Sequence, residues 1–151
     1  TRTLQEKSNG VFGKIEVKQI LEREATKTSI MQGMDWLAER MTAQDVGVFY
    51  FSGHGGLDDD ENFYLIPVDV NRDLKRSGVS GDVVRDRLAD MPGRVVCIMD
   101  ACHSGAVAES FQVGRADNLV RDLVTDDCGV VVLSSSLGSE YSMESPEIKA
   151  G

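Results

Sequence analysis

His54 and Cys102 are the two residues of this sequence whose types and placing suit nucleophilic chemistry. Each comes shortly after a run of apolar residues, Val46–Phe51 before the histidine and Val95–Met99 before the cysteine. Such runs are typical of strands buried on both faces of a parallel sheet. Adjacent parallel strands bring their carboxyl ends to one edge, where a thiol facing an imidazole can be activated as a nucleophile. We therefore expect His54 and Cys102 to meet at one edge of a sheet.

Small and polar residues surround both candidates. The histidine lies in Ser52-Gly53-His54-Gly55-Gly56, and the cysteine lies in Asp100-Ala101-Cys102-His103-Ser104-Gly105. Glycines let a backbone come close to a substrate, and they leave the amide after His54 able to donate a hydrogen bond. The two motifs therefore predict a site in which the substrate lies against the backbone.

Together the two motifs resemble those of the caspase-like cysteine peptidases, and within them the metacaspase-like and prokaryotic branch. Cys102 lies 48 residues after His54 (102 − 54), which fits the roughly 50-residue separation in caspases. A caspase proper would have Gln where Asp100 stands. The resemblance continues through Val130 to Glu144, so it covers most of the chain.

The resemblance implies hydrolysis of a peptide bond by a Cys-His dyad. Cys102 attacks the scissile carbonyl as a thiolate, and His54 takes the proton and then gives it to the leaving amine. The amides of Gly55 and Cys102 would hold the oxyanion. His103 is the second histidine of the chain, and we expect it to point elsewhere because it neighbours Cys102 in sequence.

The resemblance also implies a preference for basic substrates. In metacaspases the acid two residues before the nucleophile, here Asp100, lines a first specificity pocket for Arg or Lys, and it would repel Asp. Many relatives have a second acid where Ser139 stands. Glu140 is the candidate replacement, or else it faces solvent. Backbone groups of a serine segment would pair with an extended substrate: Ser134, Ser135 and Ser136.

Hydrophobic periodicity predicts alternating strands and helices. Strands are expected at Val11–Val17, at the two runs before the site and at Val130–Leu133, with a short extended segment at Phe63–Val68. A helix should start near Ala25–Thr28, because Ile30, Met34, Leu37 and Met41 recur at helical spacing. Further helices are expected from Ser80 to Met91, with Ser80 or Asp82 as the N-cap, and at Ala116–Val124.

Strand–helix alternation favours an α/β fold with a mostly parallel central sheet and helices on both faces. At 151 residues the chain is one domain, over 1–151. The resemblance implies a caspase-like peptidase domain seen as its large-subunit core. It also implies that the first strand and helix and the small-subunit strands of the family lie outside this sequence.

The acidic stretch Asp58-Asp59-Asp60-Glu61 has two interpretations. It is a solvated loop, or it contributes carboxylates to a calcium site together with Asp69. Several metacaspases are activated by calcium, although the spacing here matches no EF-hand. No other cofactor is expected.

Composition limits the classes of partner. The formal net charge of −9 argues against nucleic acid or an anionic membrane and suits basic substrates. Three cysteines without regular spacing form neither a disulfide framework nor a zinc site, and Cys97 and Cys128 should be buried and inert.

No signal peptide or long apolar run is present, so we expect the protein to be located in the cytoplasm. The expected partners are a protein or peptide substrate, the small-subunit segment and a regulatory or sensor domain.

Three alternatives to a peptidase follow from the same residues. A cysteine phosphatase would need Arg six residues after the nucleophile, where this chain has Ala108. A nucleotide-binding domain would need a phosphate-binding glycine loop, and the Ser52–Gly56 motif matches neither standard fingerprint. A catalytically inactive caspase-like scaffold that recruits partners remains the non-enzyme alternative.

Overall fold

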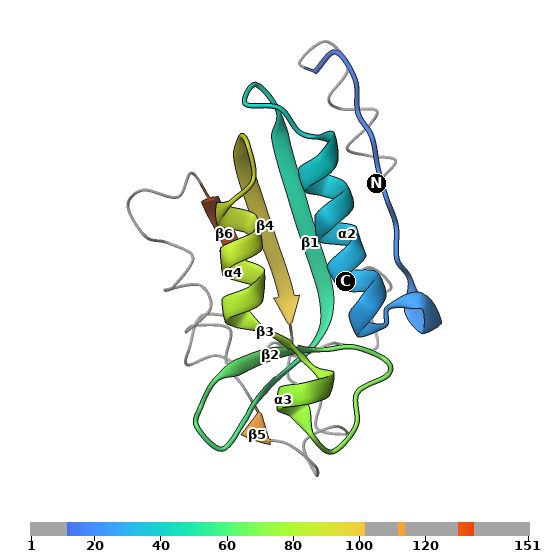
Figure 1. The fold of residues 1–151 in the computed structure, drawn as a ribbon, viewed down its shortest axis with the longest axis vertical. Helices are drawn as coiled ribbons and strands as arrows, with labels where there is room; N and C mark the ends of the chain where they lie inside the picture. The colour runs from blue at the N-terminus through green and yellow to red at the C-terminus, as the bar shows by residue number, and fades with distance from the viewer. Residues whose placement is uncertain (1–11, 102–111, 114–129, 135–151) are drawn as a thin grey trace, which may run out of the picture.

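The computed structural model describes residues 12–101, 112–113 and 130–134. Figure 1 shows their helices and strands, coloured in chain order. In sequence they are η1 (Glu22–Glu24), α2 (Lys27–Arg40), β1 (Val46–Leu57), β2 (Phe63–Ile66), α3 (Leu74–Ser77), β3 (Val79–Ser80), α4 (Gly81–Ala89), β4 (Arg94–Ala101), β5 (Gln112–Val113) and β6 (Val130–Ser134).

The strands form one mixed sheet in the order β3-β2-β1-β4-β6, with β5 also paired to β1. The central neighbours β1, β4 and β6 are parallel, whereas the pairs β1–β2 and β2–β3 are antiparallel. The α/β fold with a parallel centre is therefore confirmed. Strand β1, which contains His54, and strand β4, which ends one residue before Cys102 in sequence, are adjacent and parallel, as the sequence predicts.

Strand β1 is longer than the apolar run that predicts it. Its first part, Val46–Gly53, pairs with β4, and its second part, His54–Leu57, pairs with β2 on the other edge. The prediction that the strand stops before Ser52 is wrong, because pairing with β2 keeps the glycine-rich stretch extended. His54 is the first residue of the antiparallel part.

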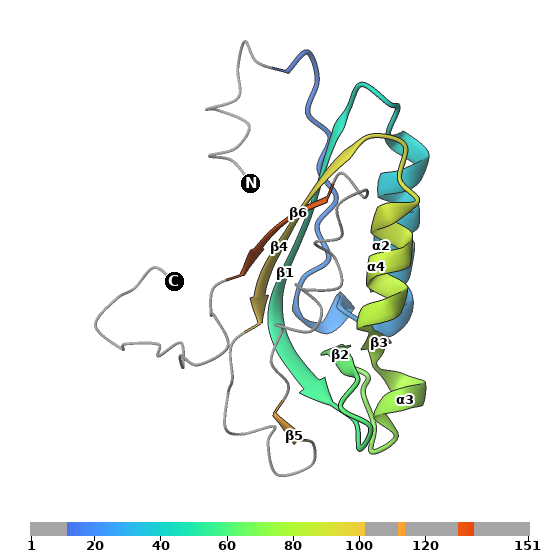
Figure 2. The same ribbon diagram turned by 90° about the vertical axis from the view of Figure 1, so that its left-hand side faces the viewer.

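Helices α2 and α4 both lie against the same face of the sheet (Figure 2). Alternate residues of β4, namely Val95, Cys97 and Met99, are fully buried on that face. They pack with Ile30 and Met34 of α2 and Val84 and Leu88 of α4. Helical cover of the second face depends on the expected helix at 116–124, which lies outside the described residues.

Side-chain caps fix where both long helices begin. Thr26 Oγ1 accepts a hydrogen bond from Ser29 N at 3.1 Å, and Ser80 Oγ accepts one from Val83 N at 3.3 Å. An oxygen at this position satisfies an amide that has no partner within the first turn. The predicted helix starts are thereby confirmed, and Ser80 rather than Asp82 is the N-cap of α4.

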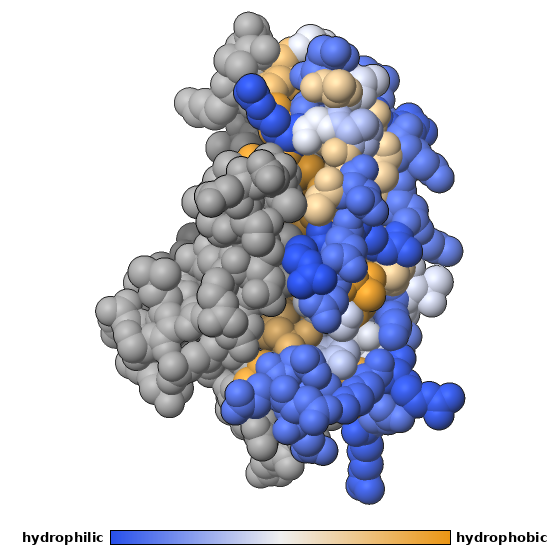
Figure 3. Space-filling view, turned by 60° about the vertical axis from the view of Figure 1, so that its left-hand side comes forward, coloured by the Kyte–Doolittle hydropathy of each residue, from blue (hydrophilic) through white to orange (hydrophobic). Residues whose placement is uncertain are grey.

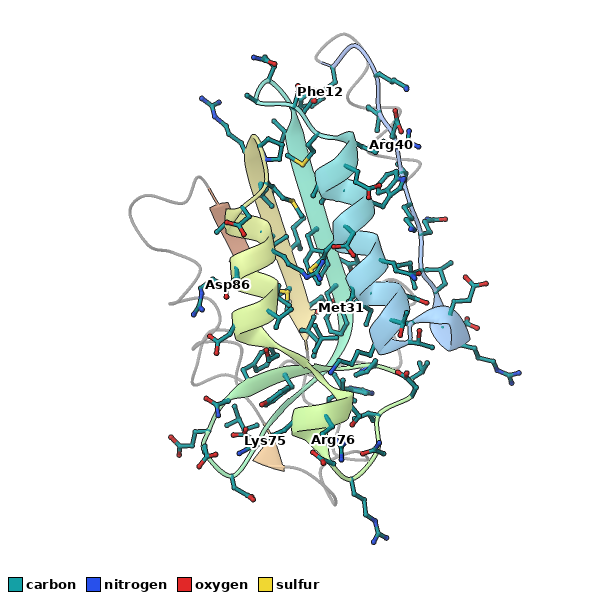
Figure 4. All side chains as sticks on the ribbon, in the orientation of Figure 1. Phe12, Met31, Arg40, Lys75, Arg76 and Asp86 are labelled. Atoms are coloured by element: carbon teal, nitrogen blue, oxygen red, sulfur yellow. The ribbon has the colours of Figure 1, made fainter. Side chains whose placement is uncertain are left out.

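The predicted strand Val11–Val17 is not a regular strand in the part of it that the structure describes. Phe12 forms a single bridge, and the chain after it continues outside any ladder. This segment instead contacts α2: Glu16 Oε2 lies 2.9 Å from Arg40 Nη1, and Lys18 Nζ lies 5.9 Å from the centre of the Trp36 ring. Figure 4 labels Phe12 and Arg40 near the same end of the molecule.

Candidate active site

His54 occupies the point at which β1 passes from its parallel partner to its antiparallel one. Gly53 pairs with Ala101, the last residue of β4, and His54 pairs with Ile66 of β2. Side chains alternate between the faces of a strand, so His54 lies on the face opposite the helices, as Ser52 does. The structure therefore places the candidate base at the carboxyl end of the β1–β4 pair.

Asp100 lies on the same face and at the same end of the sheet as His54. It pairs in register with Ser52, and Ser52 Oγ donates a hydrogen bond to Asp100 Oδ2 at 3.5 Å. Sequence reasoning did not single out Ser52 as a site residue. The signal was present, because Ser52 and Asp100 each lie two residues before a candidate catalytic residue.

Two phenyl rings cover the glycines on either side of His54. A Cβ added at Gly53 would lie 2.9 Å from Phe51 Cζ, and one added at Gly55 would lie 2.6 Å from Phe63 Cε2. Both added atoms would point toward the helices, away from the face of His54. Both glycines thus leave room for these rings, in addition to allowing a close approach of a substrate.

Asp58 is the buried centre of the acidic turn between β1 and β2. Its carboxylate accepts hydrogen bonds from Asp60 N and Asn62 N, both at 2.9 Å, and from the Tyr64 hydroxyl at 3.2 Å. Burial alone would raise the pKa of Asp58. The hydrogen bonds, led by those from the Asn62 side chain and backbone, outweigh burial and lower this pKa to about 2.

The other members of the acidic turn face solvent. Lys75 of α3 contacts Asp60 Oδ2 at 2.5 Å and lies 3.7 Å from Asp58 Oδ2. The hydrogen bond with Asp60 raises the pKa of Lys75. Figure 4 labels Lys75 at the end of the molecule that carries this turn, and Figure 3 shows that end as mostly hydrophilic. The turn therefore has one buried carboxylate, that of Asp58, and three solvent-exposed ones.

The carboxylate of Asp69 forms a hydrogen bond with the first residue of α2. Its Oδ1 accepts a hydrogen bond from Lys27 N at 2.8 Å, and Val68 N donates to Ala25 O at 3.0 Å. Among the residues that the structure describes, no group of three or more potential metal ligands is found. Calcium binding by Asp58, Asp59, Asp60 and Asp69 stays a prediction.

Of the other residues that the sequence analysis names, Ser134 and Cys97 lie within the ranges that the structure describes. Ser134 ends β6 and pairs with Met99 of β4, so its backbone lies beside the end of the cysteine strand. Cys97 is fully buried, and burial raises the pKa of its thiol to about 12, which fits an inert cysteine. The following predicted residues lie outside the described ranges: Cys102, His103, Cys128, Ser135, Ser136, Ser139 and Glu140.

None of the helices in the described part of the chain is long and apolar enough to cross a bilayer.

The known proteins that resemble this chain include fungal metacaspases. The chain is 35% identical over 108 residues to Metacaspase-1 of Yarrowia lipolytica, an alignment that covers 64% of this chain and 23% of the relative. It is 30% identical over 127 residues to Metacaspase-1 of Scheffersomyces stipitis, covering 70% of this chain and 30% of the relative. The chain thus spans less than a third of these relatives. Both are fungal, so the prokaryotic branch stays a prediction.

A solved structure and a family model complete the comparison. Protein GSU0716 from Geobacter sulfurreducens shares the fold, with a TM-score of 0.52 at 18% identity, over 78% of this chain and 55% of that one. The model of the caspase domain matches residues 4–150. The chain therefore belongs to the caspase domain family of cysteine endopeptidases.

Proposed function

We propose that the protein hydrolyses peptide bonds after Arg or Lys, with Cys102 as nucleophile and His54 as base. The observation that supports this proposal best is the register of β1 and β4. Gly53 and Ala101 are paired, and each is followed directly by one member of the proposed dyad. Consecutive Cα atoms are about 3.8 Å apart, so neither catalytic residue can be far from this pair.

The reaction proceeds in two displacements at the substrate carbonyl. His54 accepts the proton of the Cys102 thiol, and the thiolate adds to the carbonyl carbon to give a tetrahedral oxyanion. The C–N bond then breaks, the His54 imidazolium protonates the leaving amine, and a thioester remains on Cys102. Water, deprotonated by His54, adds to the thioester and releases the carboxylate product and the thiol. The amides of Gly55 and Cys102 stabilise the oxyanion at each addition.

Asp100 selects the residue before the scissile bond. Its carboxylate stands beside the carboxyl end of the β1–β4 pair, where Ser52 donates a hydrogen bond to it. A guanidinium or ammonium group would pair with this carboxylate, and a substrate Asp would be repelled. Backbone groups of Ser134, Ser135 and Ser136 hold the extended substrate, and Glu140 adds a second negative charge to the pocket.

The cellular setting is part of the same proposal. The substrates are proteins or peptides, cleaved in the cytoplasm within a regulated proteolytic or cell-death and defence pathway. A small-subunit segment completes the domain, and a regulatory or sensor domain controls it. The acidity of the chain, with a formal net charge of −9, supports basic substrates over nucleic acid.

A thiol-reactive peptide probe that ends in Arg tests the proposal in the intact protein. The probe should label Cys102 covalently, and a matched probe ending in Asp should label it far more slowly. Cys102→Ala should abolish labelling, and His54→Ala should slow it much more than His103→Ala does. An intact, folded protein that takes up neither probe would instead be the inactive scaffold. Equal labelling by the two probes would overturn the specificity alone.

A further inference from the structure

The ring of Phe63 fills the space that a side chain at residue 55 would need. A Cβ added at Gly55 would lie 2.6 Å from Phe63 Cε2 and 2.8 Å from Phe63 Cζ. Contacts this short require one of the two groups to move. Phe63 is only 5% exposed and belongs to the main hydrophobic core, so its ring has little freedom to move.

Backbone conformation does not explain why residue 55 is glycine. The φ angle of Gly55 lies outside the left-handed region, so any L-residue could adopt it. The contact also follows from the register, because Gly55 pairs with Leu65 and Phe63 pairs with Leu57. Phe63 is therefore the diagonal cross-strand neighbour of Gly55, and aromatic rings reach that far on one face of a sheet. An aromatic ring that covers a cross-strand glycine is a known means of fixing strand register.

The equivalent contact at Gly53 is looser. A Cβ added there would lie 2.9 Å from Phe51 Cζ, but Phe51 is only half-buried and is on the same strand. Phe63 comes from β2, so its contact also links β2 to the part of β1 that begins at His54. The contact of Phe63 with Gly55 is therefore the tighter of the two, and it alone joins two strands.

We propose that Phe63 is a positioning residue for the active site, acting through its contact with Gly55. The ring supports the β1 backbone from the helix side and so fixes the positions of the His54 side chain and the Gly55 amide on the other. This role rests on the proposed peptidase function. A displacement of about 1 Å at a reacting group can reduce a rate by as much as a hundredfold.

Size compensation between the two positions tests this role in the intact protein. Gly55→Ala should lower kcat on an Arg peptide by at least about tenfold, with KM changed less, because the new methyl displaces the strand against the ring. Phe63→Leu provides space for that methyl, since leucine lacks the ring atoms that contact it. The double variant Gly55→Ala/Phe63→Leu should therefore regain most of the lost kcat. Gly33 lies on α2, and a Cβ added there would lie 2.9 Å from Ile20 Cδ1. Gly33→Ala is therefore the matched remote control and should leave kcat unchanged.

The outcomes separate this role from the proposed function. If wild-type protein cleaves the peptide and the double variant stays as slow as Gly55→Ala, Gly55 is required by the substrate and the role of Phe63 is wrong. The role is also wrong if Phe63→Leu and the double variant change the melting temperature while Gly55→Ala leaves kcat intact. If wild-type protein neither cleaves the peptide nor takes up the Arg probe, the proposed function fails and the positioning role fails with it.

Discussion

At the scale of single residues, Asp58 shows how an acid-rich sequence can produce one buried charge. Burial of its carboxylate is outweighed by hydrogen bonds from the Asn62 side chain, from the backbone amides of Asn62 and Asp60 and from the Tyr64 hydroxyl, which together lower its pKa to about 2. An unfolded Asp titrates near 3.9, so the depressed value favours the folded state above that pH. The contribution disappears as the pH falls from about 4 toward 2.

We therefore expect the stability advantage of wild type over Asp58→Asn to shrink as the pH falls from about 4 to about 2. Thermal melts recorded between pH 2 and pH 6 measure this advantage directly. The exposed Asp59 provides the control, because Asp59→Asn should follow wild type across the range. An advantage that is constant with pH would contradict the assignment of the lowered pKa to Asp58.

A second prediction at the scale of single residues concerns Asp100. Asp100→Ala should lower kcat/KM on Arg peptides by at least about tenfold, which corresponds to about 1.4 kcal/mol, because the substrate cation loses its partner. Ser52→Ala removes only the hydrogen bond that orients the carboxylate, so its loss should be smaller. Steady-state kinetics on matched Arg and Asp peptides measure both effects, and an unchanged preference in Asp100→Ala would exclude this pocket.

The dyad can be proposed from the sequence because its two residues are chemically distinctive and follow apolar runs. Phe63 and Ser52 cannot be recognised in the same way. Phe63 resembles any core residue until the β1–β2 register places its ring against Gly55. The importance of Ser52 likewise depends on which residue of β4 stands opposite it. Long-range register is the information that periodicity along one segment does not contain.

At the scale of elements, the start of α2 receives two side-chain acceptors. Thr26 accepts from Ser29 N, and Asp69 accepts from Lys27 N at 2.8 Å. Amides of the first helical turn have no partner within the helix, so each acceptor stabilises it. The Asp69 contact also ties the segment after β2 to α2.

Asp69→Ala should therefore lower the free energy of unfolding by about 1 kcal/mol, the usual effect of removing an N-terminal cap. Urea denaturation in the presence of EDTA isolates this effect from metal binding. Thr26→Ala is the matched variant, and its loss should be similar. Unchanged stability of Asp69→Ala in EDTA would show that the contact with Lys27 contributes nothing.

The starts of α2 and α4 could be predicted from the sequence, and the reason is local. The caps Thr26 and Ser80 and the apolar spacing of α2 are contained within single segments. Strand β1 exceeded its prediction because β2, a separate segment, extends it through His54–Leu57. The Val11–Val17 prediction failed over its described part because no ladder forms there, although its apolar alternation resembles a strand.

At the scale of the whole molecule, the helices in the described part of the chain cover one face of the sheet and leave apolar side chains exposed on the other. Val46, Val48 and Tyr50 are 41%, 45% and 59% exposed, on the face opposite α2 and α4. Apolar side chains in the N-terminal segment are also exposed, among them Val17 and Leu21 at 44% and 60%. We propose that the expected helix at 116–124 covers the sheet face and that a further strand and helix of the native protein cover the N-terminal segment, since such exposed apolar surfaces favour association in water.

Residues 1–151 expressed alone should therefore aggregate or unfold without a sharp transition. A thermal melt combined with size-exclusion chromatography measures both properties. Coexpression with the proposed additional strand and helix should restore a monodisperse protein that unfolds cooperatively. A monodisperse monomer with a sharp transition in the absence of any added segment would show that this stretch is self-sufficient.

The change of partner within β1 has a consequence for hydrogen exchange. Amides of Val46–Gly53 are protected by the parallel sheet, and those of Gly55–Leu57 belong to the short hairpin with β2, whose end at Gly56 and Leu57 also pairs with the two-residue strand β5. Regions of a protein open in cooperative units with different free energies, and a four-residue hairpin should open at lower cost than the sheet core. Opening of the hairpin alone would then move His54 while the strand that leads to Cys102 stays protected, so catalytic competence could be lost without global unfolding.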